Sequence, residues 1–193
     1  MRLCFASNNA HKLEEIRPLL PAGTELLSLA DIGCQEELPE TQDTLEGNAL
    51  QKAQYVWEHY GIPCFADDTG LEVTALNGEP GVYSARYAGP QRSAADNVQK
   101  LIRELEGQTD RTARFRTVVA LVLSPDEKHL FDGTVQGTII PEQRGAGGFG
   151  YDPVFVPTEG DGRSFAEMPL AAKNQLSHRS RAVSKLVAFL NHR

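Results

Sequence analysis

The chain has 193 residues, of which 40% are hydrophobic and 23% are charged, and its formal net charge at pH 7 is −7. These values are typical of one globular domain over residues 1–193 and argue against disorder, collagen and coiled coil. The acidic balance predicts no nucleic-acid partner, and the lack of a signal peptide or of an apolar run of roughly 20 residues predicts no membrane partner and a cytoplasmic location.

The first half of the chain predicts buried strands that alternate with helices. Apolar residues recur at helical spacing after the first short apolar run, and Gly61 followed by Pro63 is a typical helix stop. The predicted strands are 2–6, 62–66 and 71–76, and the predicted helices are one that ends near residue 20 and one over 44–60. We expect the strand after Gly61 to end at Asp67-Asp68-Thr69-Gly70.

The second half of the chain predicts a long hairpin between two helices. Residues 112–123 and 129–140 are β-prone runs on either side of the turn Ser124-Pro125-Asp126-Glu127. Further elements are helices over 93–106 and 177–190 and a short strand over 154–156. Because early strands connect through helices and later ones through a tight turn, the sequence predicts an α/β fold with a mixed sheet.

Two polar segments follow predicted strands. Ser7, Asn8 and Asn9, with Lys12, lie at the start of a helix, where backbone N–H groups suit a phosphate. The alternative is that this segment only caps the helix.

Asp67 and Asp68 are adjacent, so their side chains point to opposite faces of a strand, and one of them is a candidate ligand for Mg²⁺. The alternative there is an Asx-turn at a strand end.

The acidic loop before the second helix is interpreted mainly as solvated. Its acids are Glu36, Glu37, Glu40 and Asp43, of which at most one or two are candidate metal ligands.

Asn48 and Lys52 are four residues apart and share a helix face. The three cysteines, at positions 4, 34 and 64, lack zinc-motif spacing, and Cys4 and Cys64, which lie in apolar runs, are interpreted as buried thiols.

Two late segments carry aromatic and basic residues. Phe149 lies between glycines, which suits either stacking on a planar base or packing into the core. His178 and Arg179 open the last helix, where basic side chains oppose the helix dipole. This placement indicates either a ligand-binding pair or a solvent-exposed pair. Lys173 lies just upstream.

Taken together and in order, six motifs resemble the inosine/xanthosine triphosphate pyrophosphatase family. The resemblance runs from Ser7 to Arg181. The motifs are SNNAHK at 7–12, TLEGNALQKA at 44–53, FADDTGLEV at 65–73, PGVYSARYAG at 80–89, GGFGYDPVF at 147–155 and SHRSRA at 177–182.

The resemblance implies a long mixed central β-sheet flanked by helices, two lobes with a cleft between them, and a homodimer. It implies Mg²⁺-dependent hydrolysis of noncanonical purine nucleoside triphosphates (ITP, dITP and XTP) to the monophosphate and pyrophosphate. By resemblance, Asp68 is the catalytic carboxylate and a metal ligand, together with Glu40. The implied substrate-binding residues are Ser7, Asn8, Asn9, Lys12, Lys52 and Thr69 near the phosphates, and Phe149, Gly150, Tyr151, Asp152, Lys173, His178 and Arg179 around the nucleoside.

One departure leaves the second metal ligand open. Many family members have Glu immediately before the asparagine that is Asn48 here, whereas this chain has Gly47 there and the acid at Glu46. Both Glu40 and Glu46 are therefore candidates, and we favour Glu40. Two other functions stay open: a nucleotide pyrophosphatase with another base preference, and a nucleotide-binding protein without catalysis.

Overall fold

The computed structural model describes residues 1–193, which fold into helices around a sheet of seven strands. The strands are β1 Arg2–Phe5, β2 Glu25–Leu27, β3 Cys64–Val73, β4 Pro80–Gly81, β5 Thr112–Ser124, β6 Glu127–Ile139 and β7 Phe155–Pro157. The α-helices are α1 Ala10–Ile16, α2 Leu45–Tyr60, α3 Ala94–Glu104, α4 Leu170–Leu176 and α5 His178–Asn191. Short 3₁₀ turns lie at Arg17–Leu19, Thr74–Leu76, Ser84–Arg86, Asp152–Val154 and Phe165–Glu167.

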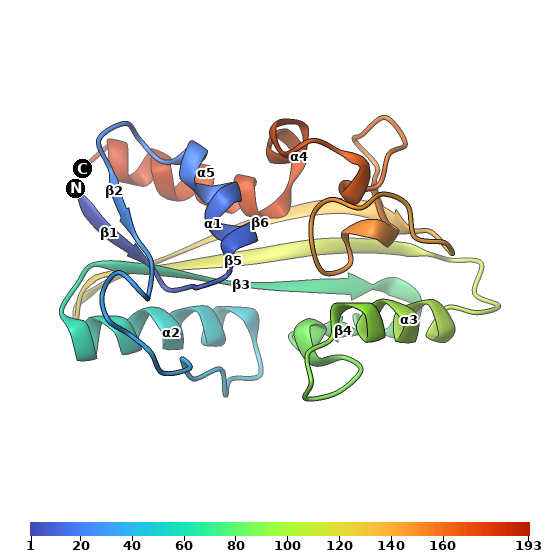
Figure 1. The fold of residues 1–193 in the computed structure, drawn as a ribbon, viewed down its shortest axis with the longest axis horizontal. Helices are drawn as coiled ribbons and strands as arrows, with labels where there is room; N and C mark the ends of the chain where they lie inside the picture. Colours follow the sequence, from blue (N-terminus) through green and yellow to red (C-terminus); the bar gives the residue numbers. More distant parts are fainter. The chain divides into compact units, whose positions relative to one another are not determined.

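The sheet is mixed, as the sequence predicts. Its order is β2-β1-β3-β5-β6-β7, and β4 pairs with β3 (Figure 1). β1 runs parallel to β2 and to β3, whereas β3 is antiparallel to β4, and β6 is antiparallel to β7. Only Pro125 and Asp126 join β5 to its neighbour β6, as the predicted hairpin requires. No helix combines the length and the hydropathy that a bilayer-spanning segment needs.

The chain forms two compact units, each assembled from separate segments. Unit 1 contains Met1–Asp68, Thr117–Gly133 and Arg179–Arg193, and unit 2 contains Thr69–Arg116 and Thr134–His178. The long strands β3, β5 and β6 therefore contribute residues to both units.

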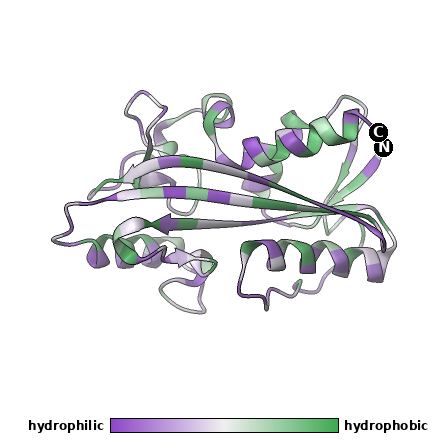
Figure 2. Ribbon diagram, turned by 180° about the vertical axis from the view of Figure 1, so that it is seen from behind, coloured by the Kyte–Doolittle hydropathy of each residue, from purple (hydrophilic) through white to green (hydrophobic).

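The core of unit 1 lies between β1, β3 and β5 and the helices that cover them. Phe5 and Phe65 stack with ring centroids 4.8 Å apart, and they pack in one cluster with residues of α1 and α5. Figure 1 shows α1 and α5 over one face of these strands and α2 over the other. Ala49, Ala53 and Val56 of α2 are fully buried. The helices carry the mixed hydrophobic and hydrophilic surfaces of amphipathic helices (Figure 2).

The core of unit 2 is built around three phenylalanines. Phe115 of β5 lies against Phe155 of β7, with centroids 4.5 Å apart, and Phe155 lies 5.2 Å from Phe165. Val98 and Leu101 of α3 belong to the same cluster. This core supports the Gly148–Asp152 segment and α4, which carry the predicted nucleoside-binding residues.

The structure corrects the sequence analysis at the two aspartates. Asp67 and Asp68 do not end a strand, because β3 continues through them to Val73 and makes one strand of the two that were predicted. Residues 74–76 are a 3₁₀ turn that Asn77 ends at φ 55°. The Asx-turn alternative is therefore wrong. A strand can include both acids because basic side chains neutralise the buried one, as described below.

The remaining predicted elements are confirmed with small changes at their ends. Thr44 caps α2 by accepting a hydrogen bond from the Gly47 N–H, and Gly61 ends the helix at φ 63°. The sequence analysis did not anticipate β2, β4 or α4, which are only three, two and seven residues long. The strands β2 and β4 carry too few residues for a recognisable hydrophobic period. Cys4 and Cys64 are buried and unbridged, as predicted, and Cys34 is also buried and unbridged.

Candidate active site

The alternation of side chains along β3 separates the two aspartates. Asp67 is on the same face as Phe65, which packs beside α1 and α5, and Asp68 points to the opposite face, which α2 covers. Asp67 is only 1% exposed, whereas Asp68 is partly exposed. One strand therefore places one carboxylate inside the protein and leaves the next one accessible.

Asp67 is the centre of a buried charge cluster in unit 1. Lys12 Nζ of α1 donates to Asp67 Oδ1 at 3.0 Å, and Arg179 Nε of α5 donates to Asp67 Oδ2 at 3.1 Å. Lys52 Nζ donates to the Asp67 backbone carbonyl at 2.6 Å. Burial alone would raise the pKa of Asp67, but the charges of Lys12, Arg179 and Lys52 outweigh it and hold the pKa well below its usual value.

Arg179 is 1% exposed and binds a second buried acid. Its Nη1 donates to the carboxylate of Glu15 in α1, which is 3% exposed. Burial opposes the charged guanidinium, but Asp67 and Glu15 outweigh it and raise the pKa of Arg179. The solvent-exposed alternative for His178 and Arg179 is therefore wrong, since His178 is only 3% exposed.

The pKa of Asp68 is raised, in contrast to that of Asp67. Burial is the largest cause that raises the pKa of Asp68 to about 6, and the charges of Glu40 and Asp67 add to it against those of Lys52 and Lys12. A carboxylate whose pKa lies near neutral pH can both accept and release a proton at the working pH. Lys52 Nζ also lies 2.8 Å from Glu40 Oε1, so Lys52 joins the Glu40 carboxylate to β3.

The predicted phosphate loop is ordered by its own hydrogen bonds. Asn9 caps α1 through its Oδ1, which accepts from the Lys12 N–H at 3.3 Å, and Ser7 Oγ accepts from the Asn9 N–H at 3.0 Å. Asn8 Oδ1 accepts from the Ala30 N–H at 3.2 Å. Asn9 thus caps α1, and the loop is held in a defined conformation next to Lys12.

The charge of the unit 1 cluster fits a divalent cation. Three basic side chains (Lys12, Lys52 and Arg179) face four acids (Glu15, Glu40, Asp67 and Asp68). With every group ionised, the acids outnumber the basic groups, so this set lacks the excess positive charge that would attract a triphosphate. No group of three or more His, Cys, Asp or Glu side chains is gathered as a metal cage. Mg²⁺ does not need one, because it is commonly held by one or two carboxylates, waters and substrate phosphates.

Unit 2 places an aromatic ring and a lysine together. Phe149 is partly exposed, and Lys173 Nζ lies 4.8 Å from the centroid of its ring. Asp152 Oδ2 accepts from Lys173 Nζ at 2.7 Å and from the Phe149 N–H at 3.0 Å. Asp152 and Lys173 are both buried. This buried ion pair orients the turn that holds Phe149, with Gly150 at φ 60°.

The other predicted nucleoside contacts of unit 2 are largely inside it. The Tyr151 ring is 6% exposed, and its hydroxyl donates to the Ser84 carbonyl at 2.6 Å. The His178 ring stacks on Phe115, with centroids 4.5 Å apart and planes at 15°. Thr69, which follows Asp68 directly in β3, is partly exposed.

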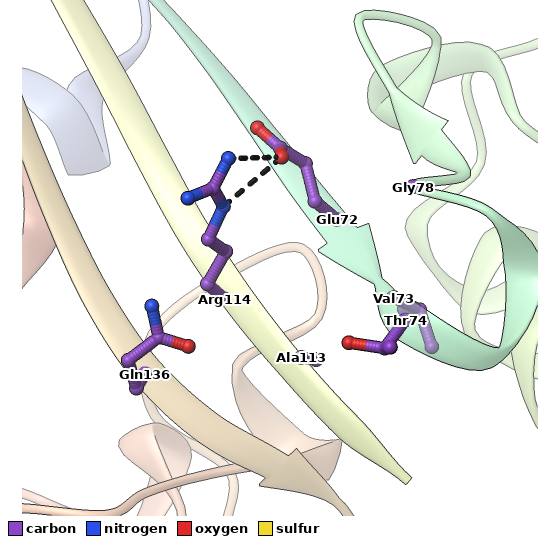
Figure 3. Close-up of a pocket in the computed structure, with 7 residues that line it drawn as sticks. All are labelled: Glu72, Val73, Thr74, Gly78, Ala113, Arg114 and Gln136. Atoms are coloured by element: carbon purple, nitrogen blue, oxygen red, sulfur yellow. Dashed lines mark hydrogen bonds and ion pairs between the residues drawn. The ribbon is translucent and has the colours of Figure 1, made fainter. Parts of the chain in front are cut away.

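A separate hollow in unit 2 does not offer the same chemistry. It has a volume of about 330 Å³ and is lined by Glu72, Val73, Thr74, Gly78, Ala113, Arg114 and Gln136 (Figure 3). Arg114 is already paired with Glu72 through contacts of 2.8 and 3.0 Å to one carboxylate oxygen. The basic group of this hollow is therefore neutralised by its neighbour.

Sequence reasoning missed the structural part of the cluster. It named Asp67 only as the partner of Asp68 and did not single out Glu15. Glu15 precedes the buried Ile16 in α1, but an acid beside an apolar position gives no clear signal of burial. The pairing became visible only when the fold brought α1, β3 and α5 together.

Comparison with known proteins agrees with this architecture. Residues 3–189 match the model of the Ham1 family. The chain is a member of the Ham1 family. The family resemblance drawn from the six motifs is thereby confirmed.

Relatives and solved structures of the Ham1 family cover nearly the whole chain. A protein of Porphyromonas gingivalis named dITP/XTP pyrophosphatase is 56% identical over 190 residues, which span 98% of this chain and 97% of that one. One of Flavobacterium johnsoniae with the same name is 53% identical, with 98% of each chain covered. The Ham1 protein structure of Coxiella burnetii has a TM-score of 0.91 at 35% identity and covers 100% of both chains. That of Staphylococcus aureus has a TM-score of 0.89 at 37% identity, with 100% of this chain and 99% of that one covered.

Proposed function

We propose that residues 1–193 form one pyrophosphatase domain that hydrolyses noncanonical purine nucleoside triphosphates (ITP, dITP and XTP). The products are the nucleoside monophosphate and pyrophosphate. The observation that carries the proposal is the Asp68 carboxylate, partly exposed and with a pKa raised to about 6, beside Glu40 and Lys52. The names of the Ham1 relatives support the substrate class.

In the proposed reaction, water attacks the α-phosphorus. A new P–O bond forms from the water oxygen, and the bond from the α-phosphorus to the bridging oxygen breaks, so that pyrophosphate leaves with that electron pair. Asp68 accepts the proton of the attacking water, and its raised pKa suits this role. A non-catalytic nucleotide-binding protein would not need such a carboxylate.

Glu40 and Asp68 would hold Mg²⁺. When bound, Mg²⁺ supplies positive charge that polarises the phosphate and stabilises the developing charge on the leaving oxygens. The position of Glu40, bonded to Lys52 and electrostatically coupled to Asp68, supports Glu40 over Glu46 as the second ligand. Glu46 lies instead in the first turn of α2.

Lys12 and Lys52 would bind the phosphates, with Ser7, Asn8, Asn9 and Thr69 as polar contacts. Burial is the largest cause that lowers the pKa of Lys12, and Lys52 and Arg179 add to it, while Asp67 opposes them. An anion that binds beside such a lysine offsets the repulsion from the neighbouring cations, and it thereby favours the charged form of the lysine.

The nucleoside contacts are also part of the proposal. Phe149 would stack on the purine, with Gly150, Tyr151, Asp152, Lys173 and His178 around the nucleoside, whereas Arg179 is bound to Asp67 and Glu15 in the unit 1 cluster. The partial exposure of Phe149 supports stacking over core packing. Hypoxanthine and xanthine carry an acceptor oxygen at position 6, whereas adenine carries a donor there, so donors in the protein would be left unpaired by ATP. We further propose a cytoplasmic homodimer.

The test is pyrophosphate release from ITP, dITP and XTP beside ATP, GTP, dTTP and UTP, with Mg²⁺ and with a chelator. We expect metal-dependent release confined to the inosine and xanthosine nucleotides. Release mainly from dTTP or UTP would keep the chemistry and overturn the base preference. Tight binding without release would show a nucleotide-binding protein.

A further inference from the structure

The segment of residues 36–42, which we call the strap, is fastened along α2 by side chains of that helix. The contacts run in opposite order along the strap and the helix. They are Glu36 with Tyr60 and Tyr55, Glu40 with Lys52, Thr41 with Gln51, and Gln42 with Asn48. Glu40 therefore lies within a segment whose two ends are both tied to the same helix.

Glu36 is the anchor at the first end of the strap. Its Oε1 accepts hydrogen bonds from the Tyr60 hydroxyl at 2.8 Å and from the Tyr55 hydroxyl at 3.1 Å. Its Oε2 accepts from the Gln35 N–H at 3.1 Å. A hydrogen bond from its own backbone N–H is the largest cause that lowers the pKa of Glu36 to about 2, followed by that from Tyr60.

The tyrosine side of this anchor is itself fixed. The His59 ring stacks on Tyr55, with centroids 3.9 Å apart, and His59 Nδ1 lies 2.9 Å from the Tyr55 carbonyl. Both tyrosines belong to the last two turns of α2, which Gly61 ends. The hydroxyls are therefore presented from a rigid element, and hydrogen bonds to an ionised acceptor are stronger than neutral ones.

Glu40 itself is bound by Lys52 of α2, whose Nζ lies 2.8 Å from Glu40 Oε1. Its side chain is 23% exposed, so neighbouring groups do not enclose it. Between Glu36 and Glu40 lie only Glu37, Leu38 and Pro39, and the fixed φ of proline limits how far Glu40 can move relative to Glu36.

We propose that Glu36, held by Tyr55 and Tyr60, is the positioning residue that keeps Glu40 beside Lys52 and Asp68 for a divalent cation. The role of the cation rests on the proposed function, whereas the anchoring of the strap does not. Glu36 does not touch the substrate or the metal. Its effect is to pre-organise Glu40 before the cation binds, so its loss should weaken metal binding and leave the chemical step intact once metal is saturating.

Two variants remove the anchor in different ways. Glu36→Ala deletes the acceptor, and the double variant Tyr55→Phe/Tyr60→Phe deletes both donors while it keeps the rings and their packing. Glu37→Gln is the matched control, because Glu37 is an exposed acid next to Glu36 in the same loop. Thermal unfolding of each variant checks that the fold is retained.

The first readout is amide hydrogen exchange of Thr41 and Gln42 in the metal-free protein. Their N–H groups donate to Gln51 and Asn48, so they report on strap opening. We expect exchange about tenfold faster in both anchor variants and unchanged in Glu37→Gln, as for a segment whose opening becomes easier. Unchanged exchange in the two anchor variants would overturn the proposal.

The second readout is the binding of Mn²⁺ to the nucleotide-free protein, followed by electron paramagnetic resonance. We expect the Kd to rise about fivefold in the anchor variants, which corresponds to about 1 kcal/mol. The Mg²⁺ concentration for half-maximal pyrophosphate release should rise in parallel, and kcat at saturating Mg²⁺ should recover. Faster exchange without a change in Kd would also overturn the proposal. If the wild-type protein released no pyrophosphate at all, the proposed function would fail, while exchange and Mn²⁺ binding would still decide the role of Glu36.

Discussion

Arg179 Nε donates to Asp67 Oδ2 at 3.1 Å, although 112 positions separate the two residues in the chain. The same guanidinium binds Glu15, and all three side chains are almost fully buried. This buried charge network links α1, β3 and α5, because Arg179 of α5 binds an acid on each of the other two elements.

Removal of Arg179 should therefore destabilise the protein strongly. Arg179→Met leaves two buried carboxylates without their shared base, and the loss of one partner from a buried pair costs about 3–5 kcal/mol. Urea denaturation measures it. Lys185→Met, also in α5, is the control, because Lys185 and its partner Asp132 are more than half exposed, and such a pair contributes about 0–1 kcal/mol. Equal costs for the two variants would contradict the structural role.

Asp68→Asn should abolish most of the turnover and leave the fold intact. Asparagine cannot accept the proton of the attacking water, and general-base catalysis contributes about 10²–10⁴-fold. The measurement is kcat for pyrophosphate release from ITP, beside circular dichroism of the folded variant. Asp43→Asn, an exposed acid from the loop before α2, serves as the control. Wild-type rates in Asp68→Asn would reject the catalytic assignment.

The activity should depend on pH through the same carboxylate. Because the pKa of Asp68 is raised to about 6, the base is protonated below that pH and ionised above it. We expect kcat/KM to fall about tenfold for each pH unit below 6. Raising Mg²⁺ should move the midpoint to lower pH, because a nearby cation favours the ionised carboxylate. A flat profile between pH 5 and 8 would contradict this role.

Ionisation of Asp68 at higher pH should lower the stability of the protein, whereas it should raise the activity. Its folded pKa of about 6 exceeds the ordinary value of 3.8, so folding disfavours the ionised form, and the penalty is complete above about pH 6. In metal-free buffer, Asp68→Asn should have a higher Tm than the wild type at pH 8. The difference should shrink as the pH falls from 6 towards 4. A variant that is less stable at every pH would show that Asp68 contributes to the fold.

Phe149 can be tested by keeping or deleting its ring. Phe149→Ala should raise KM for ITP by about fivefold or more, since stacking of a base on an aromatic side chain contributes about 1–3 kcal/mol. Phe149→Tyr keeps the ring and should stay close to the wild type. The rest of the turn should persist, because the Asp152–Lys173 pair does not depend on the ring. Equal KM values for the two variants would remove Phe149 from the proposed site.

The sequence predicted the fold well where its periodic patterns were long. Helix α2 was found within one residue at its start because Thr44, the apolar face and Gly61 all agreed. Strand β3 was divided in two, because two adjacent acids in the middle of a strand look like its end. The structure explains why the strand continues through these acids: Lys12 and Arg179, which are far apart in the chain, neutralise Asp67.

The site shows the same division between local and distant signals. The opposite orientations of Asp67 and Asp68 followed from strand alternation alone, and the structure agrees. In contrast, Glu36 was interpreted as a solvated loop acid. It is indeed exposed, but Tyr55 and Tyr60 bind it across 19 and 24 positions of the chain. Spacing rules cover neighbours within one element and do not report contacts between a loop and a later helix.

The three segments of unit 1 have a consequence for how the protein is made. Synthesis runs from the N-terminus, so Glu15 and Asp67 are translated well before Arg179, which begins the last segment of the unit. Until that segment emerges from the ribosome, closing this core would bury Glu15 and Asp67 without the guanidinium that binds both of them. Unit 1 should therefore complete its folding only after α5 has been made. A nascent chain that stops before Arg179 would keep its core open and accessible to proteases.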